Sequence, residues 1–119
     1  MSDFEVTIYH NPACGTSRNV LAAIRAAGVE PHIVEYLKTP PDRAQLEKLL
    51  KSAGLNVRDI LRKKAPAYSE FGLENPSVPD DVIFAAIAKE PILIERPIVV
   101  TPKGVRLCRP ADEVFPLLP

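Results

Sequence analysis

The sequence has only two cysteines, and this scarcity narrows the kinds of protein it can be. Cys14 and Cys108 lie far apart and lack the paired spacing of a metal-binding motif, so they cannot form a zinc site on their own. One pair is also too few for the disulfide scaffold of a small secreted domain. We therefore expect a protein of a reducing compartment that binds no metal ion.

The chain also lacks net charge and long apolar runs. Fifteen basic and fifteen acidic residues cancel, which removes the overall positive field that attracts nucleic acid or an anionic membrane surface. No apolar stretch approaches the roughly 20 residues that span a bilayer, and the N-terminus lacks a signal-peptide pattern. We expect a cytoplasmic protein without nucleic-acid or membrane partners, in which any anion site is local.

The length and the hydrophobic content predict a single domain over residues 1–119. A chain of 119 residues, 46% of them hydrophobic, can bury one proper core and is too short for two ordinary domains. Its thirteen prolines are scattered rather than clustered. We expect them to separate secondary-structure elements instead of marking a disordered tail.

Hydrophobic periodicity predicts strands near both ends of the chain. The predicted strands cover residues 4–9, 32–36, 97–101 and 105–108. A helix after Cys14 ends at Gly28 and joins the first two strands, which implies that they are parallel. The last two strands form a hairpin across Lys103-Gly104, and a final helix spans about 110–117.

Residues 39 to 90 are predicted to form a helical insertion. Thr39 supplies a capping hydroxyl, and Pro40 and Pro41 stand in the first turn of a helix that ends at Gly54. A short helical turn follows over 57–61, the stretch 65–79 is predicted as loop, and a helix over about 80–89 has inward residues Val82, Ile83, Ala86 and Ile87. The order βαβ, helices, ββα describes an α/β fold with a thioredoxin- or glutaredoxin-like mixed sheet.

Cys14 is the candidate nucleophile. It lies at or just before a helix N-terminus, where unpaired N–H groups and the helix dipole favour a thiolate and can hold an oxyanion beside it. The alternative is a small buried apolar residue, which is what most free cysteines are. The polar neighbours Asn11, Thr16, Ser17 and Arg18 argue against apolar surroundings.

Two other side chains near Cys14 can support its chemistry. Arg18 carries a charge that can stabilise either a thiolate or a bound anion. His10 can donate to the thiolate or help to lower its pKa, although a histidine at a strand end is often a structural residue.

The sequence resembles the ArsC-type arsenate reductases, which are linked to glutaredoxin. The matching stretches together cover nearly the whole chain in order: 8–19 (IYHNPACGTSRN), 36–41 (YLKTPP), 57–63 (VRDILRK), 91–102 (PILIERPIVVTP) and 106–110 (RLCRP). Any one of them can arise by chance, whereas the set identifies the family.

The resemblance implies arsenic detoxification by reduction of arsenate to arsenite. It implies that Cys14 attacks arsenate to form a thiolate–As(V) adduct and that Arg62, Arg96 and Arg109 cradle the anion. The residue type is suitable, because arginine stays charged and offers a planar fork of donors to an oxyanion. A single arginine taken alone is more often a solvated surface charge.

The resemblance also implies the reductants. Glutathione acts as co-substrate, glutaredoxin reduces the mixed disulfide left on Cys14, and no cofactor is bound. Ser17 stands where a dithiol oxidoreductase carries the second cysteine of Cys-x-x-Cys, so Cys14 needs an external thiol. Ser17 can also cap the helix.

Two alternative functions remain open at this point. One is a redox regulator of the same fold that binds RNA polymerase, against which Ser17 argues because such a switch needs two thiols. The other is a glutathione-dependent thiol reductase of another substrate, which has no need of the three arginines. The Cys-x5-Arg loop of phosphatase-type arsenate reductases is absent, since Arg18 follows Cys14 in Cys-x3-Arg. Cys108 is interpreted as a packing residue rather than a resolving thiol.

Overall fold

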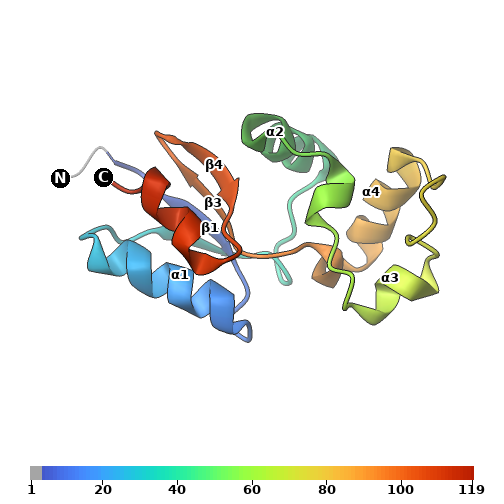
Figure 1. Ribbon diagram of the computed structural model, residues 1–119, viewed down its shortest axis with the longest axis horizontal. Coiled ribbons are helices and arrows are strands. Elements are labelled where there is room, and N and C mark those ends of the chain that lie inside the picture. The colour runs from blue at the N-terminus through green and yellow to red at the C-terminus, as the bar shows by residue number, and fades with distance from the viewer. Residues whose placement is uncertain (1–3) are drawn as a thin grey trace. The chain divides into compact units, whose positions relative to one another are not determined.

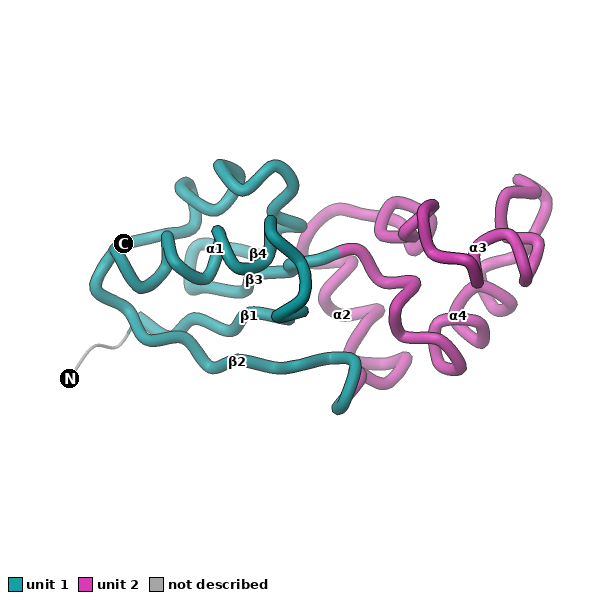
Figure 2. Tube along the Cα trace, turned by 90° about the horizontal axis from the view of Figure 1, so that it is seen from below, with its two compact units in different colours: residues 1–39, 96–119 teal, residues 40–95 magenta. Residues whose placement is uncertain are grey.

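The structure is a computed structural model that describes residues 4–119. The chain divides into two compact units, which have different colours in Figure 2: unit 1 comprises residues 1–39 and 96–119, and unit 2 comprises residues 40–95. The helical insertion predicted at about 39–90 falls almost entirely within unit 2. That the chain forms a single domain stays a prediction.

Unit 1 is built on a mixed sheet (Figure 1) with the strand order β2-β1-β3-β4, and all four strands are labelled in Figure 2. The strands are β1 (Thr7–His10), β2 (His32–Glu35), β3 (Ile98–Thr101) and β4 (Gly104–Leu107). β1 pairs in parallel with β2 and antiparallel with β3, which in turn pairs antiparallel with β4. The predicted parallel pair and the C-terminal hairpin are therefore confirmed. The turn of the hairpin is Pro102-Lys103 rather than the predicted Lys103-Gly104, because Gly104 pairs with Thr101 and begins β4.

β1 begins later than the sequence pattern predicts. The alternation from Phe4 onward predicts a strand over 4–9, whereas pairing with β2 and β3 starts at Thr7 and pairing with β2 continues to His10. Within the paired part the alternation holds, because Ile8 and His10 are buried and Thr7 and Tyr9 are only partly buried. The strand thus ends on a buried histidine directly before the loop that carries Cys14.

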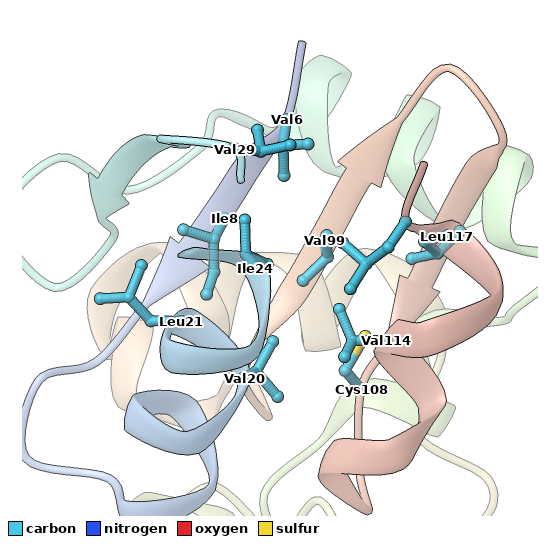
Figure 3. Packing of buried hydrophobic residues seen from close by; sticks show 11 residues of the cluster. Val6, Ile8, Val20, Leu21, Ile24, Val29, Val99, Cys108, Val114 and Leu117 are labelled. Atoms are coloured by element: carbon cyan, nitrogen blue, oxygen red, sulfur yellow. The ribbon is translucent and has the colours of Figure 1, made fainter. Parts of the chain in front are cut away.

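Two helices of unit 1 cover the same apolar core. α1 (Gly15–Ala26) follows β1, and the 3₁₀ helix η3 (Ala111–Leu117) follows β4; the two helices contact each other as well as the sheet. Their buried side chains meet those of β1 and β3 (Figure 3), and the cluster comprises Val6, Ile8, Val20, Leu21, Ile24, Val29, Val99, Cys108, Val114, Leu117 and Leu118. Pro116 lies inside η3 and has no N–H for an α-helical bond, which is one reason that this predicted helix is 3₁₀.

Unit 2 is helical. It contains α2 (Arg43–Ala53), the 3₁₀ helix η1 (Val57–Ile60), α3 (Pro66–Glu70), α4 (Asp80–Lys89) and the 3₁₀ helix η2 (Pro91–Leu93). An isolated antiparallel bridge joins Leu61 to Ile94. Over the described residues 4–119, no helix combines the length and the apolar character needed to cross a membrane.

The N-terminus of α2 differs from the sequence prediction. Asp42, and not Thr39, is the N-cap: its carboxylate accepts the Gln45 N–H at 2.8 Å, and the Gln45 side chain accepts the Asp42 N–H at 3.0 Å. This reciprocal capping box satisfies two N–H groups at once, whereas a lone hydroxyl satisfies one. The end of the helix agrees with the prediction, because Gly54 adopts the left-handed conformation with φ +71°.

The stretch 65–79, predicted as loop, contains the short helix α3. Pro66 occupies its first position, where the missing N–H costs nothing and the fixed φ suits a helix. The loop after α3 is held by Arg58, whose guanidinium donates to the carbonyl oxygens of Leu73, Asn75 and Val78 at 2.8–3.0 Å. Proline alone is therefore not a reliable marker of loop in this stretch.

The bounds of α4 agree with the prediction, but its inward face is narrower. Ile83, Ala86 and Ile87 are buried, as predicted. Val82 was expected to point inward and instead is 46% exposed. Val82 lies on the same side as Ala86, four residues later, but about 100° around the helix from Ile83, so it falls at the edge of the buried face rather than at its centre.

Candidate active site

The loop between β1 and α1 places Cys14 at the N-terminus of α1, as the sequence predicts. Cys14 is the N-cap residue, with extended backbone angles (φ −94°, ψ 123°), and its side chain is partly exposed. Its own N–H donates to the Asn11 carbonyl at 3.0 Å, and its carbonyl accepts the Arg18 N–H at 3.0 Å. The thiol therefore projects from the end of a helix where the backbone presents N–H donors.

Hydrogen bonds and positive charge lower the pKa of the Cys14 thiol below its ordinary value of 9.0. Burial alone acts in the opposite direction and raises the pKa, but the Ser17 N–H and the guanidinium groups of Arg109 and Arg96 donate to the sulfur and outweigh it. Arg109 Nη1 lies 3.6 Å from Cys14 Sγ. Each donor is worth more to a thiolate than to a thiol, so together they favour the nucleophilic form.

The register of the sheet explains why two distant arginines meet the thiol. Arg96 lies two residues before β3 and Arg109 lies two residues after β4, and the hairpin pairs Ile98 with Leu107. The same Ile98 pairs with Tyr9, near the end of β1. The start of β3, the end of β4 and the end of β1 therefore lie at the same end of the sheet.

Arg96 and Arg109 are also tied to each other. Arg109 Nη1 donates to the Arg96 carbonyl at 2.9 Å, and Arg96 is buried to 5% exposure. Both arginines precede prolines in cis peptide bonds, Arg96-Pro97 and Arg109-Pro110. The pair presents two guanidinium groups beside one sulfur, an arrangement suited to binding an oxyanion next to a nucleophile.

His10 and Ser17 form a buried pair next to Cys14. His10 Nδ1 lies 2.6 Å from Ser17 Oγ. Burial lowers the pKa of His10 below its ordinary value, and the positive charges of Arg25 and Arg18 add to this effect against the opposing charge of Glu35. At neutral pH the imidazole is therefore neutral, and the positive charge beside the sulfur comes from the arginines.

Arg18 and Arg62, the other two arginines named from the sequence, have different surroundings. Arg18 Nη1 donates to the Pro12 carbonyl at 2.9 Å, so its guanidinium braces the loop that carries Cys14. Arg62 belongs to unit 2, where its Nη1 donates to Glu95 Oε1 at 2.9 Å. A role for Arg62 in binding an anion stays a prediction.

Cys108 has the opposite environment from Cys14. It is fully buried in the unit 1 core beside Val114 (Figure 3), and its thiol points toward the Arg106 carbonyl at 3.8 Å. Burial, and to a lesser degree the charge of Glu113, raises the pKa of Cys108 to about 12. Such a thiol is a packing group and a poor nucleophile at neutral pH.

The two thiols should differ in alkylation. Because the pKa of Cys14 is lowered and that of Cys108 is about 12, iodoacetamide at about pH 8 should modify Cys14 and spare Cys108. The rate at Cys14 should rise with pH, with a midpoint below 9.0, the ordinary pKa of a thiol. Peptide mass spectrometry measures both sites, with urea-unfolded protein as the control in which both react. Equal labelling of the folded protein would contradict this interpretation.

The site can carry out nucleophilic chemistry on an oxyanion. It combines a thiol of lowered pKa, a helix N-terminus and two guanidinium groups. Within residues 4–119, no group of three or more His, Cys, Asp or Glu side chains is placed to hold a metal ion.

The sequence pattern placed Asn11 only among the polar neighbours of Cys14, although Asn11 is buried and forms hydrogen bonds with Ala13, Cys14 and Ser17. The sequence signal for this role was an asparagine in a loop, because an asparagine side chain there can accept the backbone N–H two residues later.

Comparisons with known proteins agree with this chemistry. The ArsC family model matches residues 9–115. An arsenate reductase of Rhizobium meliloti (strain 1021) is 57% identical, and one of Escherichia coli (strain K12) is 54% identical; each alignment covers 96% of this chain and 81% of the relative. A solved arsenate reductase from Vibrio cholerae matches with a TM-score of 0.92 and 42% identity, over 98% of this chain and 100% of that chain. The predicted thioredoxin-like α/β fold class is thereby confirmed.

Proposed function

The chain belongs to the ArsC family, and from this we propose that it is an arsenate reductase, an oxidoreductase that converts arsenate to arsenite. The observation that carries the proposal is the thiol of Cys14, whose pKa is lowered by the Ser17 N–H and by two arginines. Arsenate is a tetrahedral oxyanion with an electrophilic arsenic atom. A thiolate beside guanidinium donors suits both features of such a substrate.

In the first proposed step the Cys14 thiolate attacks arsenic and forms a sulfur–arsenic bond, while one arsenate oxygen leaves as water after protonation. Arg96 and Arg109 hold the anion and offset the charge on its oxygens as the bond forms. The proposal includes Arg62 as a third arsenate-binding arginine on the basis of the family resemblance. His10 and Ser17 support the loop, and Arg18 braces it through the Pro12 carbonyl.

In the following steps two thiols supply the two electrons that reduce As(V) to As(III). Glutathione attacks the adduct, arsenite leaves, and Cys14 and glutathione remain joined as a mixed disulfide. Glutaredoxin then reduces this disulfide and restores the Cys14 thiol. An external reductant is favoured because Ser17 replaces a second loop cysteine and because the buried Cys108 has a pKa of about 12.

The same chemistry separates arsenate from phosphate. Both anions have the same shape and charge, so an arginine site alone distinguishes them poorly. We propose that selectivity lies in the reaction, since thiols attack and reduce As(V) readily, whereas they attack the phosphorus of inorganic phosphate far less readily and do not reduce it. Phosphate is then a competitive inhibitor and not a substrate.

A cytoplasmic location of the protein also stays a prediction.

Arsenate-dependent consumption of NADPH tests the function, in a mixture of the protein, glutathione, glutathione reductase and glutaredoxin. We expect turnover that requires arsenate, stops when glutaredoxin is omitted and is not supported by phosphate. Absence of turnover from the folded protein overturns the proposed activity. Turnover that persists without glutaredoxin keeps the reductase and overturns the proposed reductant.

A further inference from the structure

Asn11 makes three hydrogen bonds around the loop that presents Cys14. Its side-chain Oδ1 accepts the Ala13 N–H at 2.9 Å, and its carbonyl accepts the Cys14 N–H at 3.0 Å. Its own N–H donates to Ser17 Oγ at 3.2 Å. Asn11 is 4% exposed, which is unusual for a polar side chain in a loop.

These bonds determine the backbone path into α1. The side-chain bond to Ala13 spans two residues and mimics a backbone turn, and the backbone bond to Cys14 closes the same turn one residue later. Because the turn ends on the N-cap, it sets the direction in which the Cys14 side chain leaves the helix. The bond to Ser17 ties the turn to the first turn of α1, where the N–H that donates to the thiol also lies.

We infer that Asn11 is a positioning residue for Cys14. Its Oδ1 holds the turn from Asn11 to Cys14 so that the sulfur stays aligned with the Ser17 N–H and with Arg109 Nη1. The structure gives its side chain a contact with the Ala13 N–H rather than with the sulfur, so it acts through the loop. Hydrogen bonds weaken steeply when their geometry is lost, and a loosened turn therefore leaves the thiolate less stabilised.

Three variants separate this role from simple support of the fold. Asn11→Ala removes the acceptor for the Ala13 N–H, whereas Asn11→Ser keeps a shorter acceptor that forms a weaker turn of the same kind. The matched control is Asn75→Ala in unit 2, because Asn75 Oδ1 accepts the Ser77 N–H at 2.9 Å across the same two-residue spacing. All three substitutions leave Cys14 and its donors chemically intact.

The pH dependence of Cys14 alkylation by iodoacetamide is the deciding measurement, with thermal unfolding followed in parallel. For Asn11→Ala we expect the midpoint of the profile to move to higher pH and the rate at about pH 7 to fall by about tenfold, as for the loss of one hydrogen bond to a charged group. Asn11→Ser should fall between this variant and the wild type. Asn75→Ala should match the wild type.

An unchanged alkylation profile in Asn11→Ala, even with a lower unfolding temperature, overturns the inference, because the residue then only supports the fold. A shifted profile in the Asn75→Ala control also overturns it. If Asn11→Ala does not fold, the alkylation profile of Asn11→Ser decides instead.

Only the catalytic consequence, a lower kcat with arsenate at little changed KM, rests on the proposed function. A wild-type protein that lacks arsenate turnover overturns that function and leaves the alkylation test intact.

Discussion

Replacing Cys14 by serine should abolish arsenate-dependent turnover, with a loss of at least about a thousandfold, as when other enzymes lose their covalent nucleophile. The serine hydroxyl stays protonated at neutral pH and cannot form the sulfur–arsenic bond or the mixed disulfide that follows it. The N-cap geometry should survive, because serine is a favoured N-cap residue. The fold is therefore expected to remain intact in this variant.

Two measurements test this prediction. The coupled NADPH assay measures turnover, and intact-mass spectrometry after one turnover without glutaredoxin measures the glutathione adduct on Cys14. The matched control is Cys108→Ala, which removes the second thiol from the core. This control should keep turnover while its unfolding temperature falls, since a buried side chain is shortened. Turnover in Cys14→Ser, or its loss in the control, would contradict the assignment.

Arg109→Ala should reduce kcat/KM for arsenate by about a hundredfold, because it removes one charged donor from the sulfur and, on the proposed function, one from the bound anion. The pKa of Cys14 is lowered in part by Arg109, so without this guanidinium the pKa rises and less thiolate is present at neutral pH. The part of the defect due to the thiolate should shrink as the pH is raised through the new pKa. The part due to anion binding should persist.

Profiles of kcat/KM against pH measure these two parts. Arg109→Lys is expected to fall between the wild type and the alanine variant, since lysine keeps the positive charge but lacks the planar guanidinium, whose Nη1 reaches both Cys14 Sγ and the Arg96 carbonyl. The control is Arg106→Ala on β4, the strand before Arg109, where an exposed arginine pairs with Glu113. An Arg109→Ala profile that matches the wild type at every pH would refute the proposed role.

Local sequence signals correctly predicted the helices whose ends are stabilised by the same residues that give the signal. The apolar spacing of α1 and the glycine after it, with Gly28 at φ +85°, place the helix correctly. The signals failed where two local solutions compete. Thr39 and Asp42 are both good caps, and the Gln45 side chain decides in favour of Asp42. Pro66 is compatible with a loop and with the first turn of a helix, and it starts α3.

The sequence by itself determined the order of the strands and of the longer helices and the place of Cys14 at a helix N-terminus, because these depend on residues within a few positions of one another. Only the tertiary structure decided which groups meet the sulfur. Arg96 and Arg109 are brought together by the pairing of Ile98 with Leu107 and are brought to Cys14 by the pairing of Ile98 with Tyr9. Local pattern contains no information on the long-range register of β1 against β3, which depends on the packing of the sheet against α1 and η3. The contrast between the thiols of Cys14 and Cys108 has the same origin, since burial and donors, and not residue type, separate their pKa values.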